Sequence, residues 1–283
     1  MFDTFKNRLE ITGTLTTVTA LRISKGRSTE AIGSDLPVIK DALGRPLIPG
    51  SSFKGALRSR LESFLRGIDP NLAEDPANYT SPTKNKQVKD FKDEHKNNDF
   101  ELTQQLLDIT DDIGSLFGTP WIASKFQVRD LTVQPDDWFG QYQERDGVAI
   151  DRDTETAADG KLYDYQVVPA ATPFDFKAVV ENAQDWELGL LMIGLHQFET
   201  EQIPLGGGRS RGLGVVKLEI DKMRWIDVED HPEFLLEYLK KLVMGDETAY
   251  EDAADYKDEW VQKLIDRLTR KETKLSETQT QAQ

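Results

Sequence analysis

The sequence has no cysteine, only three histidines and no apolar run approaching the roughly 18 residues that a membrane-spanning helix needs. The absence of cysteine excludes disulfides and thiolate metal sites. His95, His196 and His231 stand far apart, so the sequence shows neither a histidine metal cluster nor a Ser-His-Asp triad. Residues 1–10 lack the apolar segment of a secretion signal. Together these absences predict a cytoplasmic protein.

The charge is strongly acidic but unevenly spread. The 283 residues carry a formal net charge of −15, which is unusual for a protein that binds nucleic acid. Residues 69–112 and 221–283 each contribute −6, whereas residues 40–66 have a local excess of four positive charges. Because exposed charges more than about 10 Å apart are largely screened, a basic face can coexist with acidic outlying segments.

Residues 35–66 predict two short strands followed by a helix. The strands fall at 38–39 and 47–48, and Pro49-Gly50 then breaks the extended chain. Beyond this break apolar residues recur every four positions, which predicts one buried stripe on a helix: Phe53, Leu57, Leu61 and Leu65.

The start of this helix has the chemistry of a phosphate site. Ser51 or Ser52 is expected to cap the helix, leaving hydroxyls and backbone N–H groups close together. Lys54 and Arg58 lie four residues apart on one face and add positive charge. An ordinary amphipathic helix with solvated cations would give the same pattern.

A second segment with phosphate chemistry is glycine-rich: Gly206-Gly207-Gly208-Arg209-Ser210-Arg211. Glycines let backbone N–H groups approach a phosphate closely, and the two arginines supply charge. The segment lacks the Gly-Lys-Ser/Thr of a P-loop and leads into a strand rather than a helix. It is therefore not a nucleotide-binding fingerprint of those kinds.

These segments resemble the RAMP (repeat-associated mysterious protein) superfamily, specifically the backbone subunits of type III CRISPR effector complexes. The similarity rests on D-x-P-V-I-K-D at 35–41, P-x-I-P-G-S-S-x-K-G at 46–55 and the glycine-rich loop. I-D-R-x-T at 150–154 and L-Y-x-x-x-V at 162–167 are similar to the thumb hairpin of that family.

The expected strand–helix–strand–strand–helix–strand order fits an α+β fold with a ferredoxin-like (RRM-like) palm, formed by residues 1–66 and 113–225. A thumb β-hairpin is expected at about 134–172, and Asp159-Gly160 predicts its turn. Residues 67–112 contain few apolar residues and predict a mobile insertion or lid, partly helical around 100–109. Residues 226–283 predict two acidic amphipathic helices and, from Thr273, a disordered tail.

Three smaller expectations complete the fold prediction. Residues 113–119 should form a turn, and 126–133 one strand whose Arg129-Asp130 resembles a family "x-R-D" motif, with an internal ion pair as the alternative. His196, inside an apolar helix at 188–198, is expected to be a core or interface residue.

The resemblance also assigns candidate roles. Asp35 matches the position of the family's target-cleaving aspartate, although a single loop aspartate is by itself usually a turn or cap residue. It would act as the catalytic residue and hold a divalent metal, Mg or Mn. The residues expected to bind RNA are Arg22, Lys25, Ser51, Ser52, Lys54, Arg58, Gly207, Gly208, Arg209, Ser210 and Arg211.

The implied protein is a metal-dependent endoribonuclease that acts within a complex. Its expected partners are guide RNA (crRNA), complementary target RNA, other RAMP subunits and a large effector subunit. A non-catalytic crRNA-binding subunit and a guide-processing endoribonuclease remain as alternatives. The family often carries His-Ile-Gly where this chain has Arg22-Ile23-Ser24, which weakens the guide-processing alternative.

Overall fold

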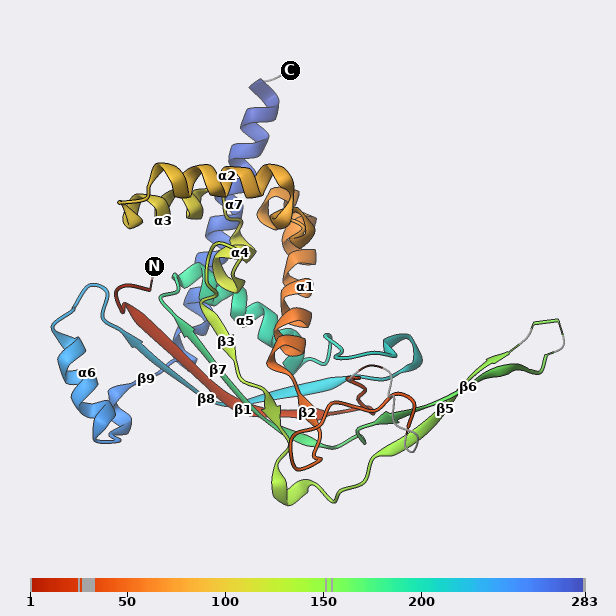
Figure 1. Cartoon of the computed structure of the whole chain (residues 1–283). Helices are drawn as coiled ribbons and strands as arrows, with labels where there is room; N and C mark the ends of the chain where they lie inside the picture. Colours follow the sequence, from red (N-terminus) through yellow and green to blue (C-terminus); the bar gives the residue numbers. More distant parts are fainter. Residues whose placement is uncertain (1, 25, 27–33, 151, 154, 282–283) are drawn as a thin grey trace.

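The protein is built on one antiparallel sheet with the strand order β3-β7-β1-β8-β9 (Figure 1). The computed structural model describes residues 2–24, 26, 34–150, 152–153 and 155–281. The strands of this sheet are β1 (Asn7–Thr17), β3 (Phe126–Val128), β7 (Pro173–Glu181), β8 (Val216–Asp227) and β9 (Glu251–Asp252).

The chain order β1-α1-β3-β7-α5-β8 is the ferredoxin-like arrangement, which confirms the predicted fold class. Its two helices are α1 (Gly50–Ile68) and α5 (Asp185–Glu199). The single strand expected at 126–133 is wrong in detail. It is divided into β3 and β4 (Leu131–Thr132), and β4 pairs with β2 (Leu47–Ile48) in a separate small sheet.

One face of the sheet is covered by α1 and α5. Side chains of β1 alternate, and Leu9, Ile11 and Leu15 are fully buried on the covered face. The Phe53 ring of α1 packs against Phe176 of β7 and Phe198 of α5, with ring centroids 5.0 and 4.3 Å apart. The four-residue stripe predicted for α1 is buried as expected.

A long hairpin leaves the sheet and points away from the body of the protein (Figure 1). It consists of β5 (Gln143–Ile150) and β6 (Ala157–Val167). The turn predicted at Asp159-Gly160 is wrong, because both residues lie inside β6. The register is set at the base of the hairpin, where Val167 is buried opposite Gln143, and it pairs Ile150 with Ala157 at the other end.

The insertion at 67–112 is largely helical. The helix expected around 100–109 is present as α3 (Asp99–Asp108), and a further helix, α2 (Pro82–Glu94), precedes it. The two helices and the segment around 121 bury a small apolar cluster centred on Val88, Leu106 and Ile122. The turn expected at 113–119 is α4 (Asp112–Phe117), whose N-cap Asp111 accepts a hydrogen bond from the Gly114 N–H.

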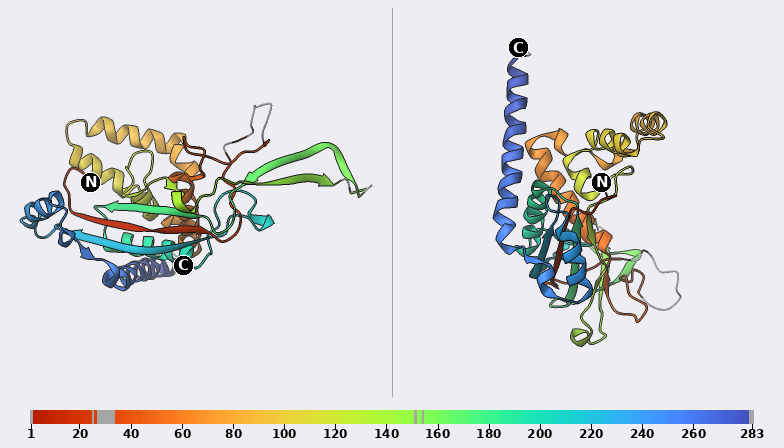
Figure 2. Two further views of the ribbon diagram at one scale, coloured as in Figure 1. Left: turned by 90° about the horizontal axis from the view of Figure 1, so that it is seen from below. Right: turned by 90° about the vertical axis from the view of Figure 1, so that its left-hand side faces the viewer.

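The C-terminal extension adds α6 (Phe234–Val243) and α7 (Lys257–Gln281). α7 continues to Gln281, through the segment from Thr273 for which a disordered tail was expected. α7 runs along α5 (Figure 2). None of the helices in the described ranges is both long and apolar enough to cross a membrane. His196 is not a core residue, since it is exposed and lies 2.9 Å from the Glu199 carboxylate.

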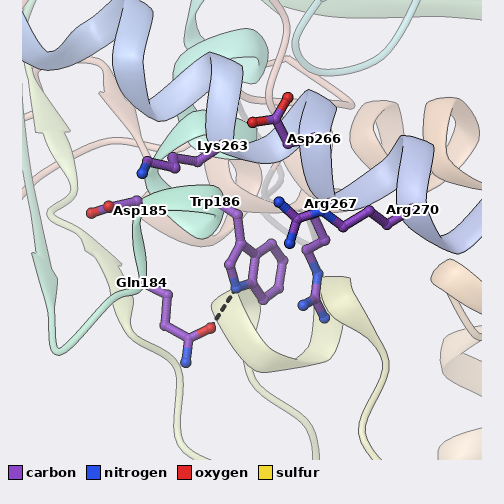
Figure 3. Close-up of a pocket in the computed structure, with 7 residues that line it drawn as sticks. All are labelled: Gln184, Asp185, Trp186, Lys263, Asp266, Arg267 and Arg270. Atoms are coloured by element: carbon purple, nitrogen blue, oxygen red, sulfur yellow. Dashed lines mark hydrogen bonds between the residues drawn. The ribbon is translucent and has the colours of Figure 1, made fainter.

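Arg267 fastens α7 to the palm. Its guanidinium lies 4.1 Å from the centre of the Trp186 ring, and its Nη2 donates to the Asp112 carboxylate at 2.9 Å. Figure 3 shows Lys263, Arg267 and Arg270 of α7 around Trp186, where they line a hollow of about 570 Å³. This hollow is lined by residues of α7 and of the first turn of α5.

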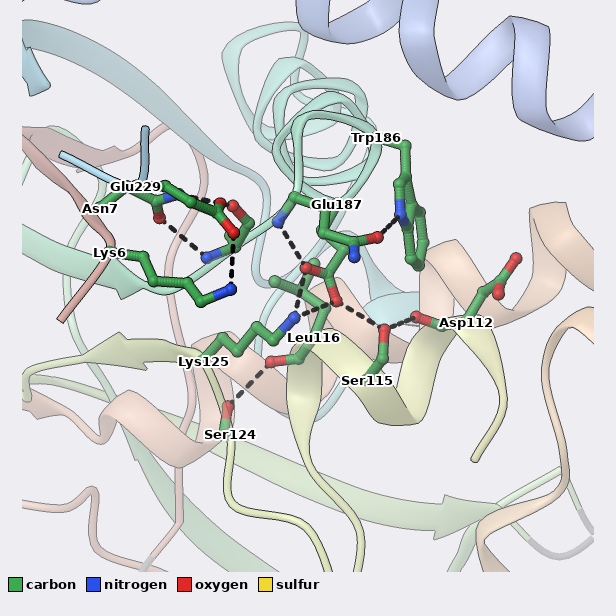
Figure 4. A network of polar contacts seen from close by, with 12 residues as sticks. Lys6, Asn7, Asp112, Ser115, Leu116, Ser124, Lys125, Trp186, Glu187 and Glu229 are labelled. Atoms are coloured by element: carbon green, nitrogen blue, oxygen red, sulfur yellow. Dashed lines mark hydrogen bonds and ion pairs between the residues drawn. The ribbon is translucent and has the colours of Figure 1, made fainter. Parts of the chain in front are cut away.

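A buried ion pair joins the residue just before β3 to α4 and α5 (Figure 4). Lys125 and Glu187 are 7% and 1% exposed, and the Lys125 Nζ donates to both Glu187 oxygens at 2.7 and 2.5 Å. The same carboxylate accepts hydrogen bonds from the Ser115 hydroxyl and from the Gln184 N–H, both at 2.7 Å. Every oxygen of this buried charge is therefore satisfied.

Replacing Glu187 by alanine is expected to lower the free energy of unfolding by about 3 kcal/mol, because it leaves the Lys125 ammonium buried without its partner. Urea unfolding followed by circular dichroism measures this loss. Glu219→Ala is the matched control, since it removes an exposed ion pair with Lys217 and should change stability little. Equal losses in both variants would contradict the structural role of the buried pair.

Candidate functional site

Four segments that are distant in sequence meet at the base of the hairpin. They are the chain after β1, the segment that begins at Ser34, β6 and the glycine-rich loop before β8. Figure 1 shows the loop and the chain after β1 close to the point where β5 and β6 leave the sheet. The segments share a small apolar cluster separate from the main core: Ala20, Leu36, Tyr163, Tyr165, Val167 and Leu213.

The glycine-rich loop is held against the chain after β1 by backbone hydrogen bonds. The Gly207 N–H donates to the Arg22 carbonyl at 2.8 Å, and the Gly214 N–H donates to the Ala20 carbonyl at 2.9 Å. Gly206 has a φ of +72°, and a Cβ there would lie 2.1 Å from the Arg22 carbonyl oxygen. Only glycine fits this approach.

The loop exposes its charged part. Arg209, Ser210 and Arg211 form a short 3-10 turn with exposed side chains. The Arg209 Nε donates to the Gly206 carbonyl at 3.1 Å, which leaves its other guanidinium nitrogens facing solvent. Gly207 was expected to offer its N–H to a phosphate, but that N–H is already bonded to Arg22. The Gly207 N–H therefore holds the loop against the chain after β1.

Arg22 lies at the centre of the site. Its guanidinium is 4.8 Å from the centre of the Tyr165 ring, within the range of a cation–π contact. Five buried side-chain atoms in the described ranges have no hydrogen-bond partner, and three of them belong to these segments: Arg22 Nε, Ser34 Oγ and Gln166 Oε1. Because about 90% or more of buried polar groups are paired, each of these atoms calls for an explanation, and polar groups of a ligand would supply the missing partners.

Asp35 is fixed in position by β6. Its N–H donates to the Asp164 carboxylate at 3.0 Å, and the Gln166 N–H donates to the Leu36 carbonyl at 3.2 Å. Leu36 therefore forms a single parallel β-bridge with Tyr165 of β6. The Asp35 side chain is partly exposed.

Two backbone hydrogen bonds link the segment that leads into α1 to this site. The Ile39 N–H donates to the Ile23 carbonyl at 2.9 Å, and the Leu47 N–H donates to the Ile39 carbonyl at 3.3 Å. Neither Ser51 nor Ser52 caps the helix, so that expectation is wrong. The Gly50 N–H instead donates at 2.8 Å to Asp130 from the other side of the small sheet. Asp130 acts as a cap supplied by a distant segment.

Lys54 and Arg58 point into the protein. The Lys54 ammonium donates to the Ser124 hydroxyl at 2.6 Å and to the Phe126 carbonyl at 3.0 Å. Arg58 is paired with Glu62 at 2.8 Å and donates to the Gly118 carbonyl and the Tyr79 hydroxyl. The structure does not bring these two cations to the hairpin base. Their contacts brace α1 against β3 and the insertion.

Burial, with a smaller contribution from the nearby Arg58, lowers the pKa of Lys54 to about 8. In the unfolded chain the same group holds its proton up to about pH 10.5. Between these values the unfolded chain binds more protons, so the contribution of Lys54 to stability rises with pH.

We therefore expect the stability of the wild type, relative to Lys54→Met, to increase as the pH is raised from about 8 to 10. Urea unfolding at four pH values measures the difference. Lys240→Met, on an exposed face of α6, is the control. A difference that is constant over this window would show that Lys54 is not held in a charge-disfavouring site.

Lys25, also expected to bind RNA, lies outside the described residues. The structure adds three residues that the sequence prediction did not single out: Tyr163, Asp164 and Tyr165. Alternation along β6 was the available signal, since Tyr163 and Tyr165 share one face of the hairpin. Which segment that face meets could not be read from the pattern.

The fold and the site define an α+β protein with a ferredoxin-like palm, a projecting hairpin and a glycine-rich loop that presents arginines at the base of that hairpin. The chain belongs to the RAMP superfamily, whose sequence model matches residues 14–217.

Curated relatives in three organisms are named "CRISPR system Cms endoribonuclease Csm3". The chain is 26% identical to the protein of Enterococcus italicus over 219 residues, covering 77% of this chain and 92% of the relative. It is 29% identical to that of Methanocaldococcus jannaschii over 233 residues, covering 78% and 82%. A shorter match of 56 residues is 52% identical to the Mycobacterium tuberculosis protein and covers 19% and 24%.

Proposed function

We propose that this protein is a backbone subunit of a type III CRISPR ribonucleoprotein, which binds the guide RNA and cleaves complementary target RNA. One observation carries the proposal: the glycine-rich loop, Arg22, the Asp35 segment and β6 meet at one place. The Csm3 endoribonucleases of CRISPR systems, which match more than three-quarters of the chain, support this assignment.

The RNA backbone would lie across the exposed loop. Arg209, Ser210 and Arg211 offer charge and hydroxyl groups, Gly208 allows close approach, and Arg22 has a buried Nε without a described partner. Guanidinium groups suit phosphate because they present several donors in a fixed plane. Ser51 and Ser52 at the start of α1 would extend the same surface. In this proposal Lys54 and Arg58 hold α1 in place and do not contact RNA.

The acidic net charge does not oppose this assignment. The insertion with α2 and α3 and the extension with α6 carry much of the acidity, and both lie away from the hairpin base (Figures 1 and 2). At physiological ionic strength the screening length is about 8 Å, so those carboxylates act weakly at the proposed RNA site.

The catalytic group in this proposal is the Asp35 carboxylate. Attack of a ribose 2′-oxygen on the adjacent phosphorus forms a cyclic phosphate and breaks the bond to the 5′-oxygen, which takes up a proton. Asp35 would accept the proton of the attacking 2′-hydroxyl or orient the phosphate. The hydrogen bond from the Asp35 N–H to the Asp164 carboxylate fixes the backbone position of the proposed catalytic residue.

The residues at this point fit a divalent ion only in part. Within the described ranges no group of three or more histidines and acids could hold a metal by itself. Mg²⁺, however, is commonly held by one or two carboxylates together with substrate phosphates and water. Asp35 and Asp164 would be the protein ligands for Mg²⁺ or Mn²⁺. A bound metal would supply positive charge against the scissile phosphate.

The assembled complex, containing guide RNA, the large effector subunit and the other RAMP subunits, tests the proposal. Incubated with a matched RNA, it should cut that RNA at fixed positions relative to the guide, and an unmatched RNA should stay intact. Intact matched RNA in a complex that retains its guide would favour the second candidate, a non-catalytic guide-binding subunit. Cleavage of isolated repeat RNA by the free protein would indicate a guide-processing enzyme.

A further inference from the structure

The aromatic ring of Tyr163 lies at the hairpin base without a role in the mechanism described above. Tyr163 and Tyr165 share a face of β6, with ring centroids 6.2 Å apart. Tyr165 is 7% exposed and its ring is covered by Arg22, so it offers no free surface. Tyr163 is only partly buried. It is therefore the ring of this pair that can meet a ligand.

Gly147 determines how the Tyr163 ring lies. It stands directly opposite Tyr163 in the hairpin, and a Cβ at this position would fall 2.3 Å from the Tyr163 Cζ. The ring consequently lies across the backbone of the neighbouring strand, in space that any side chain at 147 would take. A glycine inside a strand weakens it, and often marks a close approach of another group.

A hydrogen bond to the phenol oxygen is the second contact that holds the Tyr163 ring in place. Arg211 of the glycine-rich loop donates from Nη1 to the Tyr163 hydroxyl at 3.1 Å. The guanidinium has further N–H donors, and its side chain is exposed. An aromatic face thus lies beside a guanidinium that can bind a phosphate. Single-stranded RNA is recognised by this combination, with bases on rings and phosphates on cations.

We propose that Tyr163 is a stacking platform for one nucleobase of the RNA at the hairpin base, with Arg211 on the neighbouring phosphate. The inference rests on the proposed function, which supplies the RNA but assigns no residue to its bases. Stacking tolerates any base, because every base has a π face, so this subsite adds affinity without sequence preference. The base belongs either to the guide or to the target strand.

The alternative is a purely structural ring that covers Gly147 and stabilises the hairpin. Two substitutions separate the roles. Tyr163→Phe keeps the ring and loses only the bond to Arg211. Tyr163→Leu keeps an apolar side chain over Gly147 but cannot stack.

The experiment uses the assembled complex with 2-aminopurine placed singly along the guide or, in a second set, along a matched target. Stacking quenches 2-aminopurine fluorescence. In the wild type and Tyr163→Phe we expect quenching at positions that face this subunit, and the set in which it occurs identifies the strand. In Tyr163→Leu we expect the quenching to disappear and RNA affinity to fall about 5- to 100-fold.

Unchanged quenching and affinity in Tyr163→Leu would overturn the inference while leaving the proposed function intact. A wild-type complex that binds no RNA through this subunit would instead contradict the proposed function. Thermal unfolding of each variant checks the hairpin. If Tyr163→Leu and Tyr163→Phe lose RNA affinity equally, the hydroxyl bond to Arg211 is what matters, and the stacking role is wrong.

Discussion

Replacing Asp35 by asparagine in the assembled complex is expected to slow cleavage of matched RNA by roughly 10²- to 10⁴-fold, the usual contribution of a positioned acid or base. Asparagine has the same shape and leaves the Asp35 N–H free to bond to Asp164. The affinity of the complex for guide and target should therefore be unchanged. Single-turnover cleavage with saturating complex measures the chemical step separately from binding.

Asp136→Asn is the matched control, because Asp136 is an exposed aspartate in the 3-10 turn that precedes the hairpin. It should cleave at the wild-type rate. If Asp35→Asn also cleaved at that rate within an intact complex, the carboxylate would have no part in the chemistry. The protein would then be a guide-binding subunit.

Reversing the charge of both loop arginines, Arg209→Glu with Arg211→Glu, is expected to weaken RNA binding by roughly 10²- to 10⁴-fold, since each hydrogen bond to a charged group contributes about 1.5–3 kcal/mol. The dependence of affinity on salt should also become shallower, because fewer counterions are released when fewer phosphates are neutralised. Filter binding at several salt concentrations measures both effects.

The control for this variant carries the same change in net charge elsewhere. Lys240→Glu with Arg270→Glu alters exposed residues of α6 and α7, on the far side of the palm from the hairpin. RNA binding should change only slightly. If both double variants lost affinity equally, total charge would govern binding, and the glycine-rich loop would have no special part in it.

Elements whose signal lies within a few neighbouring residues could be predicted from the sequence. The alternation of β1, the four-residue stripe of α1 and the apolar helix α5 follow from local periodicity. The order of these elements then led to the ferredoxin-like fold. Glycine-rich turns are common, and this loop was recognisable because its glycines and arginines stand between a predicted helix and a predicted strand.

Features decided by distant segments could not be predicted. The cap of α1 comes from Asp130, 80 residues away, while the adjacent serines take no part in it. The helical position of Lys54 is typical of a solvated cation. Its ammonium nevertheless points into the protein, where it donates to the Ser124 hydroxyl and the Phe126 carbonyl. The hairpin turn was misplaced because buried residues at the hairpin base set the register and overrode the local Asp-Gly preference.

The site residues also divide into those predictable from neighbouring residues and those decided by distant segments. Asp35 could be proposed from its place in a motif, but its bond to Asp164 depends on how the segment lies along β6. The convergence of Arg22, Asp35 and the glycine-rich loop is a property of the folded chain alone.

Ultraviolet cross-linking of the assembled complex, followed by mass spectrometry of the peptides joined to RNA, tests this convergence most directly. Cross-links should fall on the segments at 20–24, 34–40, 163–167 and 206–212. Cross-links confined to the α2–α3 insertion or to α6, with these four segments unmodified in a complex that retains its RNA, would contradict the account.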